Sequence, residues 1–283
     1  MYKITRKRYL NPSVALMKVE APLVARAAKP GQFIVFRVDD LGERVPLTIA
    51  DAEPASGEIT IIFQIIGLST RLLSEKNEGE FILDIAGPLG QPTETAGAKR
   101  VCVVGGGVGC AIAYPQAKAL HSAGVYVDML AGFRNKDIVI LETEMRGQSD
   151  NLYITTDDGS YGEKGFVTAK LQSLIEGGAG YDLIIAIGPV IMMKLLCGIA
   201  KKAGIRAIVS LNPIMIDGTG MCGCCRVTVG GRTRFACVDG PDFDGHLVDF
   251  DELSRRNSVY REQEAAAMEK HVCRLTGRET ANG

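Results

Sequence analysis

The chain has 283 residues, which is enough for two domains with hydrophobic cores of their own and a further small unit. Its 32 lysine and arginine residues are balanced by 33 aspartate and glutamate residues, so neither nucleic acid nor an anionic membrane is expected as a partner. The longest apolar stretch, near residues 183–199, is interrupted by Gly188, Pro189 and Lys194, which argues against a membrane span. The first residues lack the apolar segment of a secretory signal, and a cytoplasmic protein is therefore expected.

Short β-like segments separated by turn residues fill the first part of the chain. Turns are indicated by pairs such as Asn11-Pro12, Pro30-Gly31 and Gly87-Pro88. One helix is predicted near residues 69–76. Strands are predicted at residues 4–10, 14–20, 33–38, 45–50, 58–66 and 80–85. Short strands at this spacing predict an antiparallel β-barrel over residues 1–97.

Two segments of this region carry groups suited to a phosphate. Arg44-Val-Pro-Leu-Thr48 presents a guanidinium and a hydroxyl four residues apart on a segment stiffened by Pro46. Gly67-Leu-Ser-Thr70 follows a strand and opens a helix, whose free N–H groups favour an anion. Each segment also has a plainer interpretation, as a surface arginine and as an ordinary helix cap.

From about residue 98 the pattern changes to strands that alternate with helices, which predicts a doubly wound parallel sheet over residues 98–213. The first strand begins at Arg100 and runs into glycines. Pro115 favours a following helix that starts only near that proline. Further strands are predicted at residues 125–131, 151–155, 182–187 and 207–211, and further helices at 166–176 and 191–203.

Three polar or glycine-rich turns follow strands of this predicted sheet. They are the segments Gly105–Gly109, Thr156–Gly165 and Gly188-Pro189. Because the carboxyl ends of parallel strands meet at one edge, these turns predict a nucleotide cleft. The first turn is not a full G-x-G-x-x-G, since Cys110 takes the third glycine position, and a tight turn without a ligand stays open. Cys110 itself is either a small filler or a redox-reactive thiol.

Half of the eight cysteines fall between residues 222 and 237. Asp217, Cys222, Cys225 and Cys237 follow the pattern D-x4-C-x2-C-x11-C, which is the spacing of a plant-type 2Fe–2S loop with aspartate in place of the first cysteine. The x2 spacing selects Cys225 as a ligand over Cys224. Asp217 has an alternative interpretation as a turn residue before glycine. Structural zinc is the competing metal, but a zinc ribbon needs two C-x2-C knuckles and only one is present.

A β-hairpin is predicted directly after Cys225. Alternating residues run to Gly230-Gly231, turn there and return, which is expected to bring Cys237 back beside Cys225. Residues 214–245 are therefore assigned to a cluster-binding unit. Residues 246–283 form a tail that is predicted to be helical, with apolar residues at roughly helical spacing from Phe250 to Leu275. Cys102 and Cys197 lie in apolar surroundings and are interpreted as core residues.

The motifs P-G-Q-F, R-x-P-L-T, G-x-S-T, G-P-L-G, G-G-G-x-G and T-D-D-G-S-x-G occur in this order, and the set resembles the ferredoxin reductase superfamily. The resemblance implies an FAD-binding barrel and an NAD(H)-binding domain. NAD is favoured over NADP, because no cluster of arginines and serines suits a 2′-phosphate. The implied FAD contacts are Arg44, Pro46, Leu47, Thr48, Gly67, Ser69 and Thr70. The implied NAD(H) contacts are Gly105, Gly107, Val108, Gly109, Asp157, Asp158, Gly159, Ser160, Gly188 and Pro189.

With the cysteine loop included, nearly the whole chain resembles two branches of that superfamily. One contains the electron-transfer subunits of bacterial dihydroorotate dehydrogenases, which have four cysteines. The other contains the small subunits of NADH-dependent reduced ferredoxin:NADP⁺ oxidoreductases, also called sulfide dehydrogenases, in which aspartate replaces the first cysteine. The aspartate form matches Asp217.

The second branch implies an oxidoreductase subunit that passes electrons between a 2Fe–2S cluster, FAD and NAD(H) in a flavin-based electron-bifurcating complex. It implies a heterodimer with a larger subunit that carries a flavin and 4Fe–4S clusters and reacts with ferredoxin and NADPH. No catalytic acid or base is assigned. Two alternatives stay open: an electron-transfer subunit for dihydroorotate or sulfide oxidation, and a zinc-stabilised binding module without redox activity.

Overall fold

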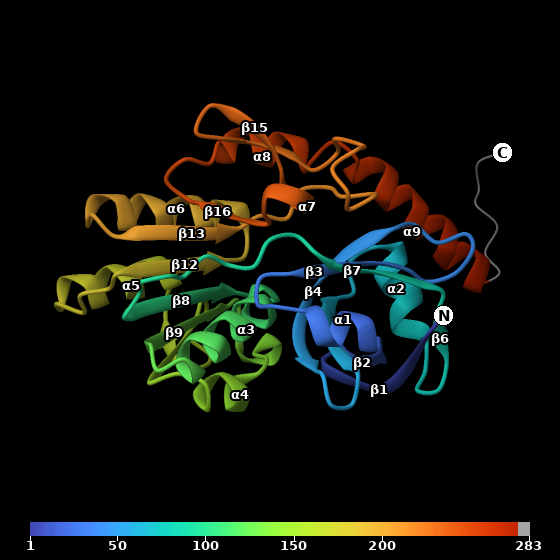
Figure 1. The fold of residues 1–283 in the computed structure, drawn as a ribbon, viewed down its shortest axis with the longest axis horizontal. Coiled ribbons are helices and arrows are strands. Elements are labelled where there is room, and N and C mark those ends of the chain that lie inside the picture. Colours follow the sequence, from blue (N-terminus) through green and yellow to red (C-terminus); the bar gives the residue numbers. More distant parts are fainter. Residues whose placement is uncertain (277–283) are drawn as a thin grey trace.

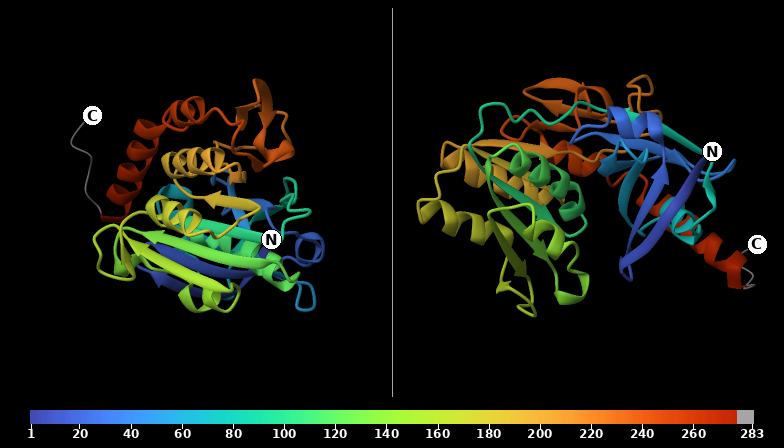
Figure 2. Two further views of the ribbon diagram at one scale, coloured as in Figure 1. Left: turned by 90° about the vertical axis from the view of Figure 1, so that its left-hand side faces the viewer. Right: turned by 60° about the horizontal axis from the view of Figure 1, so that its bottom comes forward.

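The computed structural model describes residues 1–276 and has three parts. A β-barrel lies beside a parallel α/β sheet, and the C-terminal stretch crosses over both of them (Figure 1). The right-hand view of Figure 2 again shows the barrel and the α/β sheet side by side, whereas in the left-hand view the α/β sheet lies in front of the barrel. Within residues 1–276, no helix has the length and apolar character needed to cross a membrane. The predicted fold class, a barrel followed by an α/β domain and a small C-terminal unit, is confirmed.

The barrel contains seven strands in the order β6-β1-β2-β5-β4-β3-β7, with antiparallel neighbours. Two helices accompany it, α1 (Pro22–Ala27), which the sequence pattern did not predict, and α2 (Leu68–Glu75). The strands are β1 (Tyr2–Asn11), β2 (Val14–Glu20), β3 (Phe33–Arg37), β4 (Val45–Glu53), β5 (Glu58–Gln64), β6 (Phe81–Ile82) and β7 (Asp84–Leu89).

The second sheet has the order β11-β10-β9-β8-β12-β13-β16, and all its pairs are parallel except β13 with β16. Its strands are β8 (Arg100–Gly106), β9 (Tyr126–Phe133), β10 (Asn151–Thr156), β11 (Glu163–Lys164), β12 (Leu183–Ile187), β13 (Arg206–Ser210) and β16 (Asp242–Asp244). Its helices are α3 (Gly109–Ser122), the short 3₁₀ turn η1 (Lys136–Ile138), α4 (Glu142–Arg146), α5 (Val167–Glu176) and α6 (Val190–Lys202).

Both faces of this sheet are buried, as its near-continuous apolar strands require. On β8, Val101 and Val103 belong to one hydrophobic core, whereas Cys102 and Val104 belong to the other. The first core contains residues of α3, and the second contains residues of α5 and α6. Cys102 and Cys197 are buried, in agreement with their interpretation as core residues.

The prediction that the first helix begins near Pro115 is wrong. Helix α3 begins at Gly109, and Pro115 lies inside it. The start is set by packing, because a Cβ on Gly109 would lie 2.4 Å from the carbonyl oxygen of Ile187 and only glycine allows so close an approach. A proline inside a helix removes one backbone hydrogen bond. Here Pro115 is buried, and the packing of α3 outweighs that loss.

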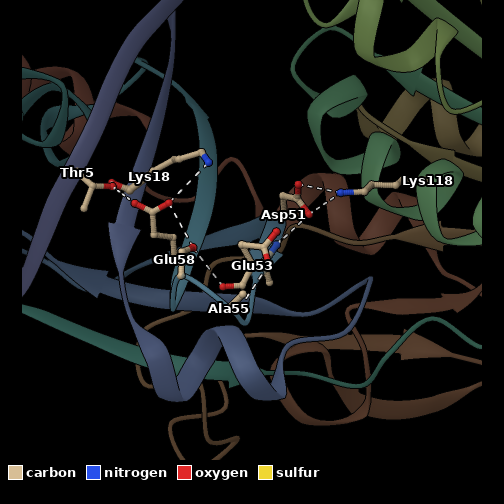
Figure 3. Close-up of polar contacts among 9 residues, drawn as sticks. Thr5, Lys18, Asp51, Glu53, Ala55, Glu58 and Lys118 are labelled. Atoms are coloured by element: carbon tan, nitrogen blue, oxygen red, sulfur yellow. Dashed lines mark hydrogen bonds and ion pairs between the residues drawn. The ribbon is translucent and has the colours of Figure 1, made fainter.

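The barrel and the α/β sheet share one hydrophobic core. Leu16 and Ile62, on the outer face of the barrel, join the same buried cluster as Ala111 of α3 and Leu141. Polar contacts surround this core: Lys118 Nζ lies 2.9 Å from each carboxylate oxygen of Asp51. Figure 3 shows this pair reaching from α3 to β4. The two units are therefore packed together as one body.

The C-terminal stretch contains the predicted hairpin, β14 (Arg226–Val229) and β15 (Arg232–Phe235). It continues with α7 (Ala236–Asp239), the edge strand β16, α8 (Phe250–Arg256) and α9 (Arg261–Thr276). The single helical tail expected from Phe250 to Leu275 is thus divided in two. The residues between the two helices, 257–260, are weaker helix formers, and the Ser258 hydroxyl donates to the carbonyl of Arg255, which ends α8 locally. The side chain of Leu275 lies outside the described residues.

Leu16→Ala tests the shared core. The leucine side chain is 8% exposed, so truncation should lower the free energy of unfolding by about 2–5 kcal/mol. Leu23→Ala is the matched control, because Leu23 is 75% exposed and its truncation should cost less than about 0.5 kcal/mol. Denaturant unfolding of the full chain measures both, and equal losses in the two variants would contradict the shared core.

Candidate functional site

The segment Arg44–Thr48 lies at the start of β4, next to β3. Thr48 is paired with Phe33 of β3, and Leu47 is paired with Ile34. Arg44 is exposed, and its Nη2 lies 3.4 Å from Asp84 Oδ2, a surface contact of little energetic weight. The guanidinium is therefore available to an anionic ligand. Pro46, Leu47 and Thr48 are each half-buried.

Ser69 and Thr70 at the start of α2 are both expected to contact FAD, but their hydroxyls differ in the hydrogen bonds that they make. The Thr70 hydroxyl accepts from the backbone N–H groups of Ile66 and Gly67 and donates to the carbonyl of Gly67. Thr70 is buried, and its hydroxyl caps the first turn of the helix. The Ser69 hydroxyl has no hydrogen bond to the described part of the chain. A Cβ on Gly67 would meet no atom within 4 Å, so the backbone there is open to a ligand.

The glycine turn after β8 lies where the strand order reverses, between β8 and β12. In doubly wound sheets ligands bind at this point, beyond the carboxyl ends of the strands. The turns after β8, β10 and β12 lie on the same edge, because these strands are parallel. The structure thus brings the three predicted nucleotide loops to one edge of the sheet.

The glycines of the first turn have different tasks. A Cβ on Gly105 would collide with Cys110, and one on Gly109 with the backbone at Ile187, so these two glycines allow close packing. Gly107 has φ +57° and nothing within 4 Å of its missing Cβ, so it is the glycine that faces open space. Burial raises the pKa of the Cys110 thiol to about 12, which keeps it protonated and supports its reading as a filler residue.

The loop after β10 is held in shape by its own polar groups. Asp158 Oδ1 accepts from the backbone N–H and the hydroxyl of Ser160, at 2.9 and 2.6 Å. The bond with the Ser160 hydroxyl and, to a smaller extent, that with its backbone N–H lower the pKa of the Asp158 carboxyl. Asp157 and Gly159 are exposed beside them. After β12, Gly188 is half-buried and Pro189 is exposed, directly before α6.

The hairpin brings two of the predicted metal ligands together. The Sγ atoms of Cys225 and Cys237 lie 3.1 Å apart, which confirms the predicted return of the chain. Both residues are buried in one hydrophobic cluster with Phe33 and Val35 of β3. Burial, followed by the neighbouring Cys225 thiol, raises the pKa of Cys237 to about 12. A metal bound there would have to displace its proton.

Asp217 closes the loop that precedes these cysteines. Its two carboxylate oxygens accept from the backbone N–H groups of Thr219 and Cys222, each at 2.8 Å. Asp217 therefore serves as a turn residue in this structure, and its place as a metal ligand stays a prediction. Cys222 is exposed and Cys224 is half-buried. Among the side chains that the structure describes, no three histidine, cysteine, aspartate or glutamate residues already stand in a metal-binding arrangement.

The donor set nevertheless suits an iron–sulfur cluster. Thiolates are the usual ligands of such clusters, and the two closely spaced thiols lie in an apolar environment that excludes water. A Cβ on Gly218 would lie 2.6 Å from Leu89 Cδ1, so this glycine lets the loop pack directly on the barrel. The residues present therefore fit the predicted group.

Three polar side chains from distant parts of the chain meet in a contact that the sequence pattern does not predict. Asp242 Oδ2 accepts from the hydroxyl of Thr93 at 2.5 Å and from Gln116 Nε2 at 3.4 Å. Thr93 lies between the barrel and the α/β sheet, Gln116 lies on α3, and Asp242 lies on β16. Burial raises the pKa of the Asp242 carboxyl to about 6. Only the folded chain brings these residues together, so spacing along the sequence gives no hint of them.

Comparison with protein families identifies the C-terminal region. Residues 212–249 match the model of the iron-sulfur cluster binding domain of dihydroorotate dehydrogenase B. A Thermotoga maritima protein named as a dihydroorotate dehydrogenase B (NAD(+)) electron transfer subunit homolog is 47% identical over 270 residues, which cover 95% of each chain. The corresponding subunit of Streptococcus pneumoniae is 33% identical, over 85% of this chain and 97% of that one.

A solved structure extends these similarities. It is that of an NADH-dependent reduced ferredoxin-NADP oxidoreductase, described for flavin-based electron bifurcation. The match has a TM-score of 0.91 with 46% sequence identity and covers 96% of this chain and 98% of the other. On these grounds, the chain belongs to the family of dihydroorotate dehydrogenase B electron-transfer subunits and their homologues.

Proposed function

We propose that this chain is the FAD- and 2Fe–2S-containing electron-transfer subunit of a flavin-based electron-bifurcating NADH-dependent reduced ferredoxin:NADP⁺ oxidoreductase. One observation carries the proposal: the cysteine pair packs on the same strand that supports the predicted flavin segment. The side chain of Phe33 belongs to the same buried hydrophobic cluster as Cys225 and Cys237, and its backbone is paired with Thr48. A single strand thus separates the place where single electrons would enter from the predicted flavin site.

The barrel would hold FAD along β4 and at the start of α2. Arg44 would bind the pyrophosphate through its forked donors, and Ser69 with the open backbone at Gly67 would bind the same group. Pro46, Leu47 and Thr48 would line the flavin. Thr70 would act indirectly, by fixing the helix start. FAD, when bound, exchanges single electrons with a metal cluster and a hydride with a nicotinamide.

The edge of the α/β sheet would bind NAD(H). Gly107 and Val108 would lie under the nucleotide at the switch point, and Gly105 and Gly109 would give the turn its close packing. The task of these residues is to position and orient the nicotinamide, and no side chain is assigned as an acid or base. The remaining predicted contacts are Asp157, Asp158, Gly159, Ser160, Gly188 and Pro189.

The cysteine loop would bind the cluster through Cys222, Cys225 and Cys237, with Asp217 as the fourth ligand. Three exposed apolar residues flank these positions in the sequence: Ile216, Met221 and Val238. Exposed apolar groups around a site favour a protein partner. The proposed partner is a larger subunit with a flavin and 4Fe–4S clusters, which would react with ferredoxin and NADPH. A cytoplasmic heterodimer is part of this proposal.

A second candidate is an electron-transfer subunit for dihydroorotate or sulfide oxidation. The names of several relatives, at 33–36% identity, favour dihydroorotate. Asp217 favours the bifurcating enzyme, because the four-cysteine form is the one expected for dihydroorotate dehydrogenases. A zinc-stabilised binding module is the candidate of another class. The packing of the cysteines on a flavin-type barrel gives it no support.

Anaerobic purification of the full chain with its natural partner tests the proposed function. We expect a coloured complex with FAD and with iron and sulfide in equal amounts in this subunit, and a partner that contains a flavin and 4Fe–4S clusters. Optical spectra, metal analysis and mass spectrometry of the partner give the answer. A colourless zinc protein would refute any redox function, and a barrel-type dehydrogenase partner would favour dihydroorotate oxidation.

Ser69→Ala and Thr70→Val separate binding from helix capping. Ser69→Ala should lower FAD retention with little loss of stability, since its hydroxyl has no other partner among the described residues. Thr70→Val removes the capping-box hydroxyl at the start of α2 and should cost about 1 kcal/mol of folding free energy. Arg44→Ala should lower FAD retention most, because it removes a charged donor. Flavin content after gel filtration and thermal unfolding measure these effects, and full FAD occupancy in Arg44→Ala would exclude the proposed pyrophosphate site.

Asp217→Asn and Asp217→Cys test the fourth ligand. Asparagine keeps an oxygen that accepts from Thr219, so it preserves part of the turn and removes the anionic ligand. We expect altered EPR g-values in both variants and a lower cluster content in Asp217→Asn. If Asp217→Cys leaves the EPR signal and the reduction potential unchanged, Asp217 is only a turn residue.

A further inference from the structure

Two arginines contact the C-x2-C knuckle of the cysteine loop. Arg226 Nη1 donates to the carbonyl oxygen of Gly223 at 3.2 Å, and Arg256 Nη2 donates to that of Cys224 at 3.1 Å. Gly223 and Cys224 are the two residues between Cys222 and Cys225. The carbonyls of the two residues between the cysteines therefore each accept from a guanidinium.

These contacts fix the orientation of two peptide groups. In a trans peptide the C=O and the following N–H point in opposite directions. When Arg226 holds the carbonyl of Gly223, the N–H of Cys224 is turned away from that guanidinium. When Arg256 holds the carbonyl of Cys224, the same applies to the N–H of Cys225. The arginines thus determine which backbone dipoles the knuckle presents to a group bound by its thiols.

The two arginines differ in sequence distance and in exposure. Arg226 lies next to Cys225 and is exposed, so solvent screens its charge. Arg256 ends α8, lies 32 residues from Cys224 and is half-buried. Helix α8 is anchored in the core of the α/β sheet, where Phe250 and Leu253 are buried together with Val227 of β14. Asn257 Nδ2 also donates to the carbonyl of Asn212, at the start of the loop region.

We propose that Arg256, assisted by Arg226, positions the cysteine knuckle and raises the reduction potential of the cluster bound there. The inference rests on the proposed 2Fe–2S site. Reduction adds one negative charge to a cluster, and a nearby fixed positive charge stabilises the reduced form. Arg256 has the larger effect, because its half-buried guanidinium is less screened than that of Arg226.

Redox titration of the full chain, followed by EPR, tests this inference. Arg256→Gln removes the charge and keeps a side-chain amide donor. We expect it to disfavour the reduced cluster roughly tenfold, which is a potential lower by about 59 mV for one electron. Arg226→Gln should give a smaller shift that decreases as salt is added. Arg256→Lys keeps the positive charge and should restore most of the potential, although it lacks the forked donor.

Arg255→Gln is the matched control. It removes the same charge from the preceding residue of α8, and no hydrogen bond joins the Arg255 side chain to the described residues of the cysteine loop. Its potential should stay close to that of the unchanged protein. Equal shifts in Arg255→Gln and Arg256→Gln, or no shift in Arg256→Gln, would overturn the proposal. Absence of any 2Fe–2S signal in the unchanged protein would instead refute the proposed function itself.

Discussion

Strand β3 is buried on both of its faces, and the placement of the predicted redox sites depends on this. Ile34 and Phe36 fill the interior of the barrel, whereas Phe33 and Val35 pack against the buried cysteines. Successive side chains of a strand point to opposite faces, so one short apolar run can serve two cores. The cysteine loop therefore covers a face of the barrel that would otherwise be apolar and exposed to solvent, and its position relative to the predicted flavin strand is fixed by packing.

Much of this arrangement follows from local sequence patterns. Short strands separated by turn residues indicate a barrel, and the later strand–helix alternation indicates a parallel sheet. The return of Cys237 to Cys225 follows from the residues between them, because Gly230 and Gly231 both have positive φ and permit the tight turn. These features are governed by neighbours in the sequence, and they could be predicted for that reason.

Other features depend on contacts between distant segments, and local patterns carry no signal for them. The start of α3 was misplaced because Pro115 is a strong local signal, whereas the packing of Gly109 on Ile187 decides the boundary. Arg256 is a surface-type residue in the sequence, yet it reaches a carbonyl in the cysteine loop. Likewise, nothing in the sequence separates Ser69 from Thr70. Their roles diverge only because the helix start engages the Thr70 hydroxyl.

Strand β16 shows that the iron–sulfur region is not a detachable module. The matched family region, residues 212–249, contains this strand, but β16 adds to the edge of the α/β sheet by pairing with β13. An α/β domain cut from the chain before the cysteine loop would leave β13 as an open edge, with unpaired backbone groups able to recruit another chain. The region that carries the cysteines therefore also covers the edge of the α/β sheet, and its removal should promote association of the remaining chain.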